Sequence, residues 1–184
     1  VINALTDAYH PCQVLSDLLT VIEHKGSVEN LKIAWVGDGN NMAQSWINAA
    51  AVLGFELHLA CPQAYFPDAQ IVDNAQKKPT ARITLGSDPV AAVKDADVVN
   101  TDVWASMGQE AEQEARKKIF APFQVNAALL ENAAKDVIVL HCLPAHREEE
   151  ITDAVLEGSH SVVWDQSENK LHMHKAILDI LIGR

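Results

Sequence analysis

The stretch Val137-Ile-Val-Leu-His141-Cys142-Leu143-Pro144 decides the fold class of this chain. Its first four residues are apolar and mostly β-branched, which is typical of a strand buried on both faces of a parallel sheet. Pro144 stops further ladder pairing because proline has no backbone N–H. Ligands of open α/β sheets bind beyond the carboxyl ends of strands, where His141 and Cys142 stand. We therefore expect a small-molecule site here, although a cysteine in such a place is more often a small apolar core residue.

The same alternation of short apolar strands and helices fills the rest of the chain. Further strands are expected at 32–36, 56–60, 82–85 and 97–101, and helices at 12–25, 42–53, 67–75, 90–94, 124–134, 152–157 and 167–182, with a small strand or extended piece at 161–165. This pattern predicts an α/β fold, a doubly wound, Rossmann-like parallel sheet of about five strands with helices on both faces. The strand ends that precede Asn41, Asp102 and Cys142 should then cluster.

The composition limits the partners and the compartment. The 184 residues carry a net charge of −11, with a sequence pI near 5.0. This charge disfavours nucleic acid and anionic membranes as partners. Three widely spaced cysteines do not form a disulfide framework and no signal peptide is evident, so a cytoplasmic location is expected. No apolar run approaches the roughly 20 residues that span a bilayer.

The glycine turn at 37–41, Gly-Asp-Gly-Asn-Asn, resembles a dinucleotide fingerprint but departs from it twice. Met42 occupies the place of the third glycine, and the strand at 56–60 ends without an acidic residue for a ribose. A nicotinamide-dependent dehydrogenase is therefore disfavoured. We expect the glycines to let Asn41 and the following helix approach a different ligand.

Histidines suggest two further kinds of site. His10 and Gln13 flank the start of a helix, where backbone N–H groups favour an anion, although a polar cap explains them equally well. A zinc site built from His141, Cys142 and His146 has no fourth ligand at a standard spacing and is disfavoured.

Four motifs in one order resemble the ornithine carbamoyltransferase family, and the resemblance covers the whole chain. They are His10-Pro11-Cys12-Gln13, Gly37-Asp38-Gly39-Asn40-Asn41, Asp102-x-x-x-Ser106-Met107-Gly108 and His141-Cys142-Leu143-Pro144. The resemblance implies an enzyme that transfers the carbamoyl group of carbamoyl phosphate to the δ-amine of ornithine. The products are citrulline and phosphate, and neither a cofactor nor a metal is implied.

The resemblance also implies a role for each matching residue. The implied catalytic residues are Cys142, beside the reacting amine, and Asp102, which binds the α-ammonium group. The implied ornithine-binding residues are Asn41, Asp102, Ser106 and Met107. The implied carbamoyl-phosphate residues are His10, Gln13, Cys142, Leu143 and Lys170. Lys170 stands where the family commonly has arginine. Its ammonium group is a point charge, whereas arginine has a planar guanidinium with paired N–H donors.

The organisation implied by the resemblance has three parts. Residues 1–30 are an interdomain segment and helix, 31–166 the ornithine-binding α/β domain, and 167–184 a helix that returns toward a carbamoyl-phosphate domain. The chain lacks the Ser-x-Arg-Thr-Arg phosphate motif of that preceding domain. We therefore expect the chain alone to be inactive. The resemblance also implies that the complete protein forms a homotrimer or a higher multiple, as is usual in the family.

Two other functions remain open to sequence reasoning. One is a non-catalytic amino-acid-binding module that keeps the same fold. The other is a carbamoyltransferase that acts on a related amine or amino acid.

Overall fold

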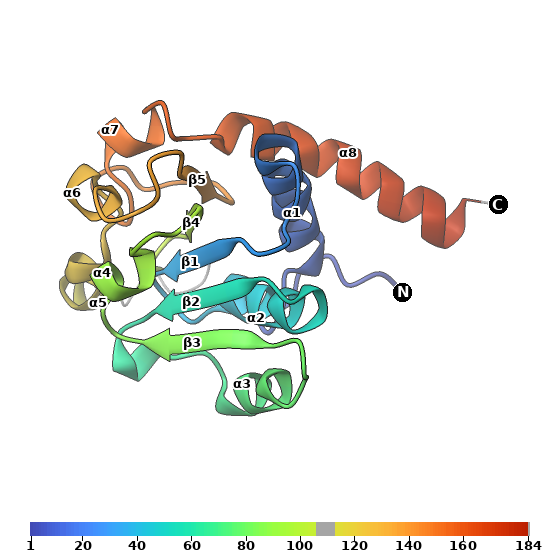
Figure 1. The fold of residues 1–184 in the computed structure, drawn as a ribbon, viewed down its shortest axis with the longest axis horizontal. Coiled ribbons are helices and arrows are strands. Elements are labelled where there is room, and N and C mark those ends of the chain that lie inside the picture. Colours follow the sequence, from blue (N-terminus) through green and yellow to red (C-terminus); the bar gives the residue numbers. More distant parts are fainter. Residues whose placement is uncertain (106–112, 184) are drawn as a thin grey trace.

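The structure is a computed structural model, and it describes residues 1–105 and 113–183. One sheet of five parallel strands runs through the centre of the molecule (Figure 1). The strands are β1 (Lys32–Val36), β2 (Glu56–Ala60), β3 (Arg82–Gly86), β4 (Val98–Thr101) and β5 (Ile138–His141). Their spatial order is β3-β2-β1-β4-β5, which confirms the predicted fold class. The order reverses between β1 and β4, and such reversals are where open α/β sheets bind ligands.

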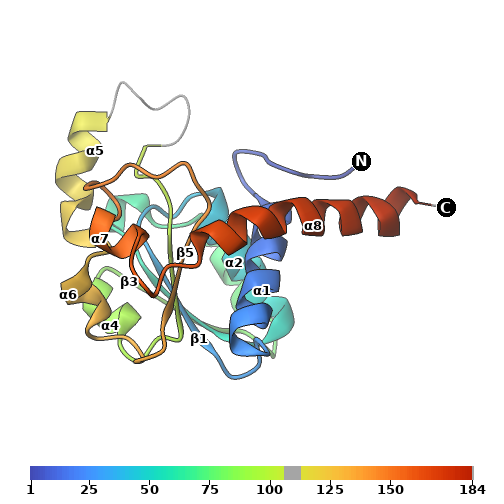
Figure 2. The ribbon, with the colours of Figure 1, turned by 90° about the horizontal axis from the view of Figure 1, so that it is seen from above.

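Helices cover both faces of the sheet, as Figure 2 shows from above. The described α-helices are α1 (Pro11–Lys25), α2 (Asn41–Leu53), α3 (Ala69–Gln76), α4 (Pro89–Val93), α5 (Gln113–Phe120), α6 (Ala127–Leu130), α7 (Asp153–Leu156) and α8 (Val163–Ile182). Alternate residues of β1 supply the two cores. Ile33 and Trp35 pack with α1, α2 and α3, whereas Ala34 and Val36 pack with α4, α6 and α7.

The predicted helix at 124–134 is wrong in extent. Only α6 is α-helical within it, and the Asn126 side chain caps that helix by accepting from the Leu129 N–H at 3.0 Å. The preceding Val125 is extended and forms a bridge with Ile151. This pairing between distant segments takes the backbone groups that a longer helix would use.

The predicted strand or extended piece at 161–165 is also wrong. Ser161 makes an isolated bridge to Val139, and α8 begins at Val163. The β-branched Val162 and Val163 favour a strand locally. Burial of Val163 against the core at the start of the helix overrides that preference.

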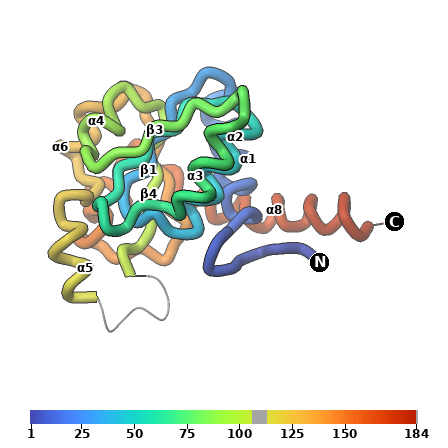
Figure 3. The backbone as a smooth tube through the Cα atoms, turned by 90° about the horizontal axis from the view of Figure 1, so that it is seen from below, coloured from blue at the N-terminus to red at the C-terminus, as the bar shows by residue number. Residues whose placement is uncertain are grey.

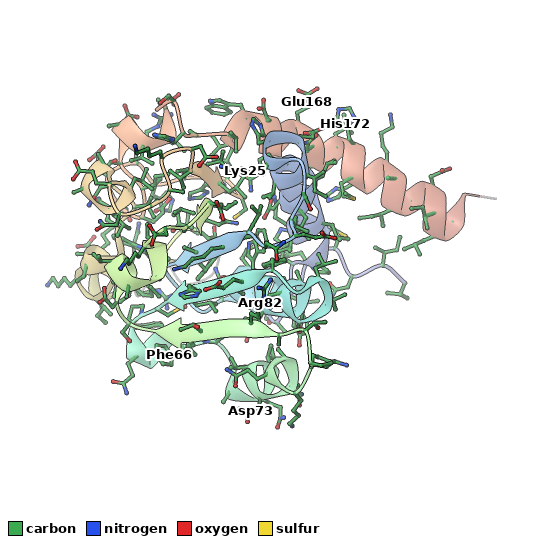
Figure 4. The ribbon with its side chains drawn as sticks, in the orientation of Figure 1. Lys25, Phe66, Asp73, Arg82, Glu168 and His172 are labelled. Atoms are coloured by element: carbon green, nitrogen blue, oxygen red, sulfur yellow. The ribbon has the colours of Figure 1, made fainter. Side chains whose placement is uncertain are left out.

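Helix α8 crosses α1 and then leaves the body of the molecule. It presents Gln166 and Asn169 to α1, whereas Glu168 and His172 point away from the sheet (Figure 4). Figure 3 shows the N-terminal segment and the end of α8 on the same side of the molecule. Within the described ranges, no helix is both long and apolar enough to cross a membrane.

Candidate active site

A cavity of about 350 Å³ opens beyond the carboxyl ends of β1, β4 and β5. Five predicted site residues lie on its wall: His10, Asn41, Asp102, Cys142 and Leu143. Gln13 and Lys170 are not among the lining residues. Ser106 and Met107 lie outside the described residues. The expected clustering of the three strand ends is therefore present, whereas two predicted contacts do not line the cavity.

Cys142 and Asp102 form a hydrogen-bonded pair on this wall. The thiol donates to Oδ1 of Asp102 at 3.0 Å, and the Val103 N–H donates to the same oxygen at 2.8 Å. Burial and then the charge of Asp102 raise the pKa of Cys142 well above its usual value. The thiol is therefore protonated at neutral pH, and it is a hydrogen-bond donor rather than a thiolate.

Asn40 orients the same carboxylate, a role that the sequence did not reveal. Its Nδ2 donates to Oδ2 of Asp102 at 2.8 Å, while its Oδ1 caps α2 by accepting from the Met42 and Ala43 N–H groups. The signal in the sequence was an asparagine at a helix start, where the residue type is a preferred cap. Asn41, the predicted residue, lines the cavity and donates to the Thr6 carbonyl at 2.9 Å.

The glycine turn fits a neighbouring loop closely. A Cβ at Gly39 would overlap backbone atoms of Tyr65 and Pro67, and the Gly39 N–H donates to the Tyr65 carbonyl at 2.9 Å. Gly37 has a φ of 139°, a backbone conformation that favours glycine. The glycines thus let the turn pack closely against the loop at 65–67, and Asn41, which follows the turn, lines the cavity.

A buried ion pair fixes the other side of this turn. Arg116, on α5, donates to the Asp38 carboxylate and to the Trp104 carbonyl, and its guanidinium lies 4.5 Å from the Tyr65 ring centre. Burial raises the pKa of Asp38 to about 6, and Arg116 opposes that rise. Sequence reasoning missed Arg116 because its partner is 78 residues away.

His141 holds the backbone after β5. The Leu143 N–H donates to His141 Nδ1 at 2.9 Å, so the ring proton is on Nε2, which donates to Glu150 Oε1 at 2.9 Å. The His146 N–H donates to the same Glu150 oxygen at 2.6 Å. Leu143 itself has a φ of 56°, which is uncommon for a leucine and needs such support.

Gln13 is buried one turn of α1 away from Asp17. Its Nε2 donates to Oδ1 of Asp17 at 2.8 Å, and its Oε1 has no hydrogen-bond partner among the described atoms. Burial raises the pKa of Asp17 to about 6, while the hydrogen bonds from Gln13 and Gln166 work against the rise. Gln166 also accepts from the His141 N–H at 2.9 Å, so this polar cluster adjoins the end of β5.

Lys170 acts on the cavity through its charge. Burial lowers the pKa of His10, and the ammonium of Lys170 lowers it further. The same ammonium lowers the pKa of Cys142, against the larger effects of burial and of Asp102. A cation therefore lies near the carboxyl end of β5.

The donor atoms of Asp102, His141 and Cys142 lie within 4.8 Å of one another and form a metal-like cluster among the described residues. Both ring nitrogens of His141 are already engaged, by Glu150 and by the Leu143 N–H. A metal at this place would have to displace one of those bonds. The cluster includes Asp102 in place of the His146 considered from the sequence.

A family model described as "Aspartate/ornithine carbamoyltransferase, Asp/Orn binding domain" matches residues 29–181. The chain belongs to this family. The ornithine carbamoyltransferase of Desulfotalea psychrophila is 64% identical over 183 residues, which are 100% of this chain and 60% of that protein. The ornithine carbamoyltransferase of Archaeoglobus fulgidus is 53% identical over 184 residues, with the same coverage. These relatives confirm the resemblance seen in the four motifs.

Solved carbamoyltransferase structures agree with the fold. The ornithine carbamoyltransferase from Pyrococcus furiosus superposes with a TM-score of 0.91 at 50% identity, over 98% of this chain and 58% of that one. The anabolic enzyme from Campylobacter jejuni gives a TM-score of 0.93 at 43% identity, over 98% and 61%. The chain spans about 60% of the length of the curated relatives that it matches.

Proposed function

We propose that the chain is the ornithine-binding part of an ornithine carbamoyltransferase. The reaction transfers the carbamoyl group of carbamoyl phosphate to the δ-amine of L-ornithine and gives L-citrulline and phosphate. The observation that carries the proposal is the Cys142–Asp102 pair on the cavity wall of a chain from this family.

The charge of the cavity favours ornithine over aspartate as the acceptor. Asp102 places a buried carboxylate on the wall, and it would attract an ammonium group and repel a second carboxylate. Its Oδ1 accepts two hydrogen bonds and its Oδ2 accepts one, from Asn40. One lone pair on Oδ2 therefore remains for the α-ammonium of ornithine. Asn41, Ser106 and Met107 complete the proposed ornithine contacts.

The proposed chemical step needs a neutral δ-amine. Its lone pair attacks the carbonyl carbon of carbamoyl phosphate, the new C–N bond forms, and the bond from that carbon to the phosphate oxygen breaks. The protonated thiol of Cys142 donates to Asp102, which leaves the sulfur lone pairs to accept an N–H of the amine and orient it. The proton released from the amine passes to the departing phosphate.

The carbamoyl group is proposed to lie between His10, Gln13 and Leu143. His10 Nδ1 lies 2.8 Å from the Ala4 carbonyl and must donate to it, so Nε2 is the nitrogen left for a ligand. Gln13 contributes the buried carbonyl oxygen that has no partner in the described structure. Lys170 contributes positive charge near the phosphate, as a point charge without the paired donors of an arginine.

A carbamoyl-phosphate domain is proposed to complete the enzyme. Two features support it: the chain spans about 60% of its relatives, and the end of α8 exposes a row of apolar residues. They are Leu178, Ile180, Leu181 and Ile182. We propose that residues 1–30 and 167–184 face that domain, that the complete protein is a homotrimer or higher multiple, and that it is cytoplasmic.

Citrulline formation tests the proposal. The complete protein encoded by the reading frame that contains this chain is expected to form citrulline from ornithine and carbamoyl phosphate, with aspartate a much poorer acceptor. The 184-residue chain alone is expected to form none. Preference for aspartate, or turnover by the isolated chain, would contradict the respective parts of the proposal.

A further inference from the structure

A chain of buried hydrogen bonds joins α1 and α8 to the end of β5. Oδ1 of Asp17, on α1, accepts from Gln13 Nε2 at 2.8 Å and from Gln166 Nε2 at 2.7 Å. The Oε1 atom of Gln166 then accepts from the His141 N–H at 2.9 Å. His141 directly precedes Cys142, so two hydrogen bonds connect the Asp17 carboxylate to the backbone of the proposed site.

The carboxylate sets the orientation of both glutamine amides. An ionised aspartate only accepts hydrogen bonds, so each glutamine must turn its NH₂ group toward Asp17. Gln166 consequently presents its carbonyl to the His141 N–H, and Gln13 is left with a buried carbonyl that has no partner within the described structure. Reversing the Gln166 amide would leave the His141 N–H unpaired in the core, which is costly.

Helix packing does not rest on Asp17 alone. Asn169 on α8 donates to Thr20 on α1 at 3.1 Å, and His24 on α1 lies 2.9 Å from Asp165 on α8. These contacts join the two helices independently. A buried charge that is only one of several links between these helices, and whose second oxygen has no partner among the described atoms, calls for a role besides packing.

We infer that Asp17 is a positioning residue for the proposed carbamoyl transfer, acting through Gln166 on the His141–Cys142 strand end and through Gln13 on the carbamoyl side. The inference rests on the proposed function. Asp17 is fully buried and does not line the cavity. It holds two amides in the one orientation that supports the strand end and leaves the Gln13 carbonyl without a partner among the described atoms.

The charged and polar groups that face Asp17 come from α8, β4 and the end of β5. Lys170 on α8 lowers the pKa of Asp17, Asn100 of β4 lies beside the carboxylate, and the charge of Asp17 raises the pKa of Cys142. Removing the charge of Asp17 should therefore make the Cys142 thiol easier to ionise. Gln166→Met keeps this charge, so it separates the hydrogen-bonded connection from the charge effect.

The test uses the complete protein and three variants. Gln166→Met keeps the chain length and removes both hydrogen bonds, Asp17→Leu removes the carboxylate, and Asp165→Asn on the same helix is the control. We expect kcat to fall about tenfold in the first two variants, as for loss of one hydrogen bond to a charged group, with the ornithine KM changed much less. The double variant should lose no more than Asp17→Leu alone, because loss of the carboxylate already breaks the connection through Gln166.

Iodoacetamide labelling of Cys142, followed by peptide mapping, gives a readout that does not require turnover. We expect labelling about threefold faster or more in Asp17→Leu, because a lower thiol pKa leaves more of the reactive thiolate at a fixed pH. The inference is overturned if kcat in Gln166→Met equals that of the control, even where labelling in Asp17→Leu is faster. If Asp17→Leu fails to fold, Gln166→Met decides, since its carboxylate is intact. A wild-type protein that forms no citrulline contradicts the proposed function, and the labelling rate of Cys142 in Gln166→Met then decides the inference: a rate equal to that of the control overturns it.

Discussion

The Cys142 thiol and the Asp102 carboxylate, 40 residues apart, meet at 3.0 Å between the ends of β4 and β5. Asn40 and the Val103 N–H hold the carboxylate from its other sides. The thiol is thereby fixed as a donor, and Asp102 keeps one position for a cation. Cys142 and Asp102 can meet because the parallel strands β4 and β5 end at the same edge of the sheet.

The thiol should respond to the charge of Asp102. Because that charge raises the pKa of Cys142, Asp102→Asn should lower the pKa and accelerate alkylation of Cys142 at a fixed pH. Asp73→Asn, on the exposed face of α3 (Figure 4), is the control. Labelling should also reach half-buried Cys142 before buried Cys12 and Cys61. Earlier labelling of either buried cysteine would contradict the placement of Cys142.

Stability should depend on pH through Asp17. The pKa of Asp17 is about 6 in the folded chain against an ordinary value of 3.8, so the folded state binds more protons between these values. The free energy of unfolding should therefore fall as pH rises from about 4 to 6, by at most about 3 kcal/mol for this group. Asp38 contributes in the same direction. In urea unfolding at pH 4.5 and 7, the free energy of unfolding of Asp17→Asn should change less with pH than that of the wild type. An equal change with pH in both proteins would refute the raised pKa of Asp17.

Two glycines should differ sharply in their tolerance of a methyl group. A Cβ at Gly39 would overlap Tyr65 and Pro67, whereas a Cβ at Gly86 meets nothing within 4 Å. Gly39→Ala should destabilise the chain by about 1–3 kcal/mol or more, because the backbone of the 65–67 loop must move. Gly86→Ala should have little effect. Thermal unfolding of the two variants compares them directly, and equal melting temperatures would count against this close approach.

Substitutions at the adjacent Asn40 and Asn41 should differ in whether they mainly lower stability or mainly weaken ornithine binding. Asn40→Ala removes the cap of α2 and a hydrogen bond to Asp102, so it should lower stability by about 0.5–2 kcal/mol. Asn41→Ala leaves the cap intact and should affect ornithine affinity more than stability. Chemical unfolding, read beside ornithine binding to the complete protein, distinguishes them. A larger loss of stability in Asn41→Ala than in Asn40→Ala would reverse these two roles.

The sequence predicted the sheet and the cavity wall because both follow from local patterns. Five short apolar segments and their turn residues located the strands, and parallel topology brought Asn41, Asp102 and Cys142 to one edge. The role of Asn40 was missed because it depends on the residue at which α2 begins, and helix boundaries are the least certain feature of a sequence pattern. Asp17 and Gln166 lie 149 residues apart, so their contact leaves no local signal.

Ornithine kinetics of the complete protein with Asp102→Asn test the central claim most directly. The substitution nearly keeps the shape and removes the charge proposed to bind the α-ammonium group. We predict that the ornithine KM rises about tenfold or more and that kcat falls, as for loss of a charge-assisted hydrogen bond worth about 1.5–3 kcal/mol. The carbamoyl-phosphate KM should change far less. An ornithine KM and a kcat equal to those of the wild type would contradict the assignment of Asp102 to the ornithine site.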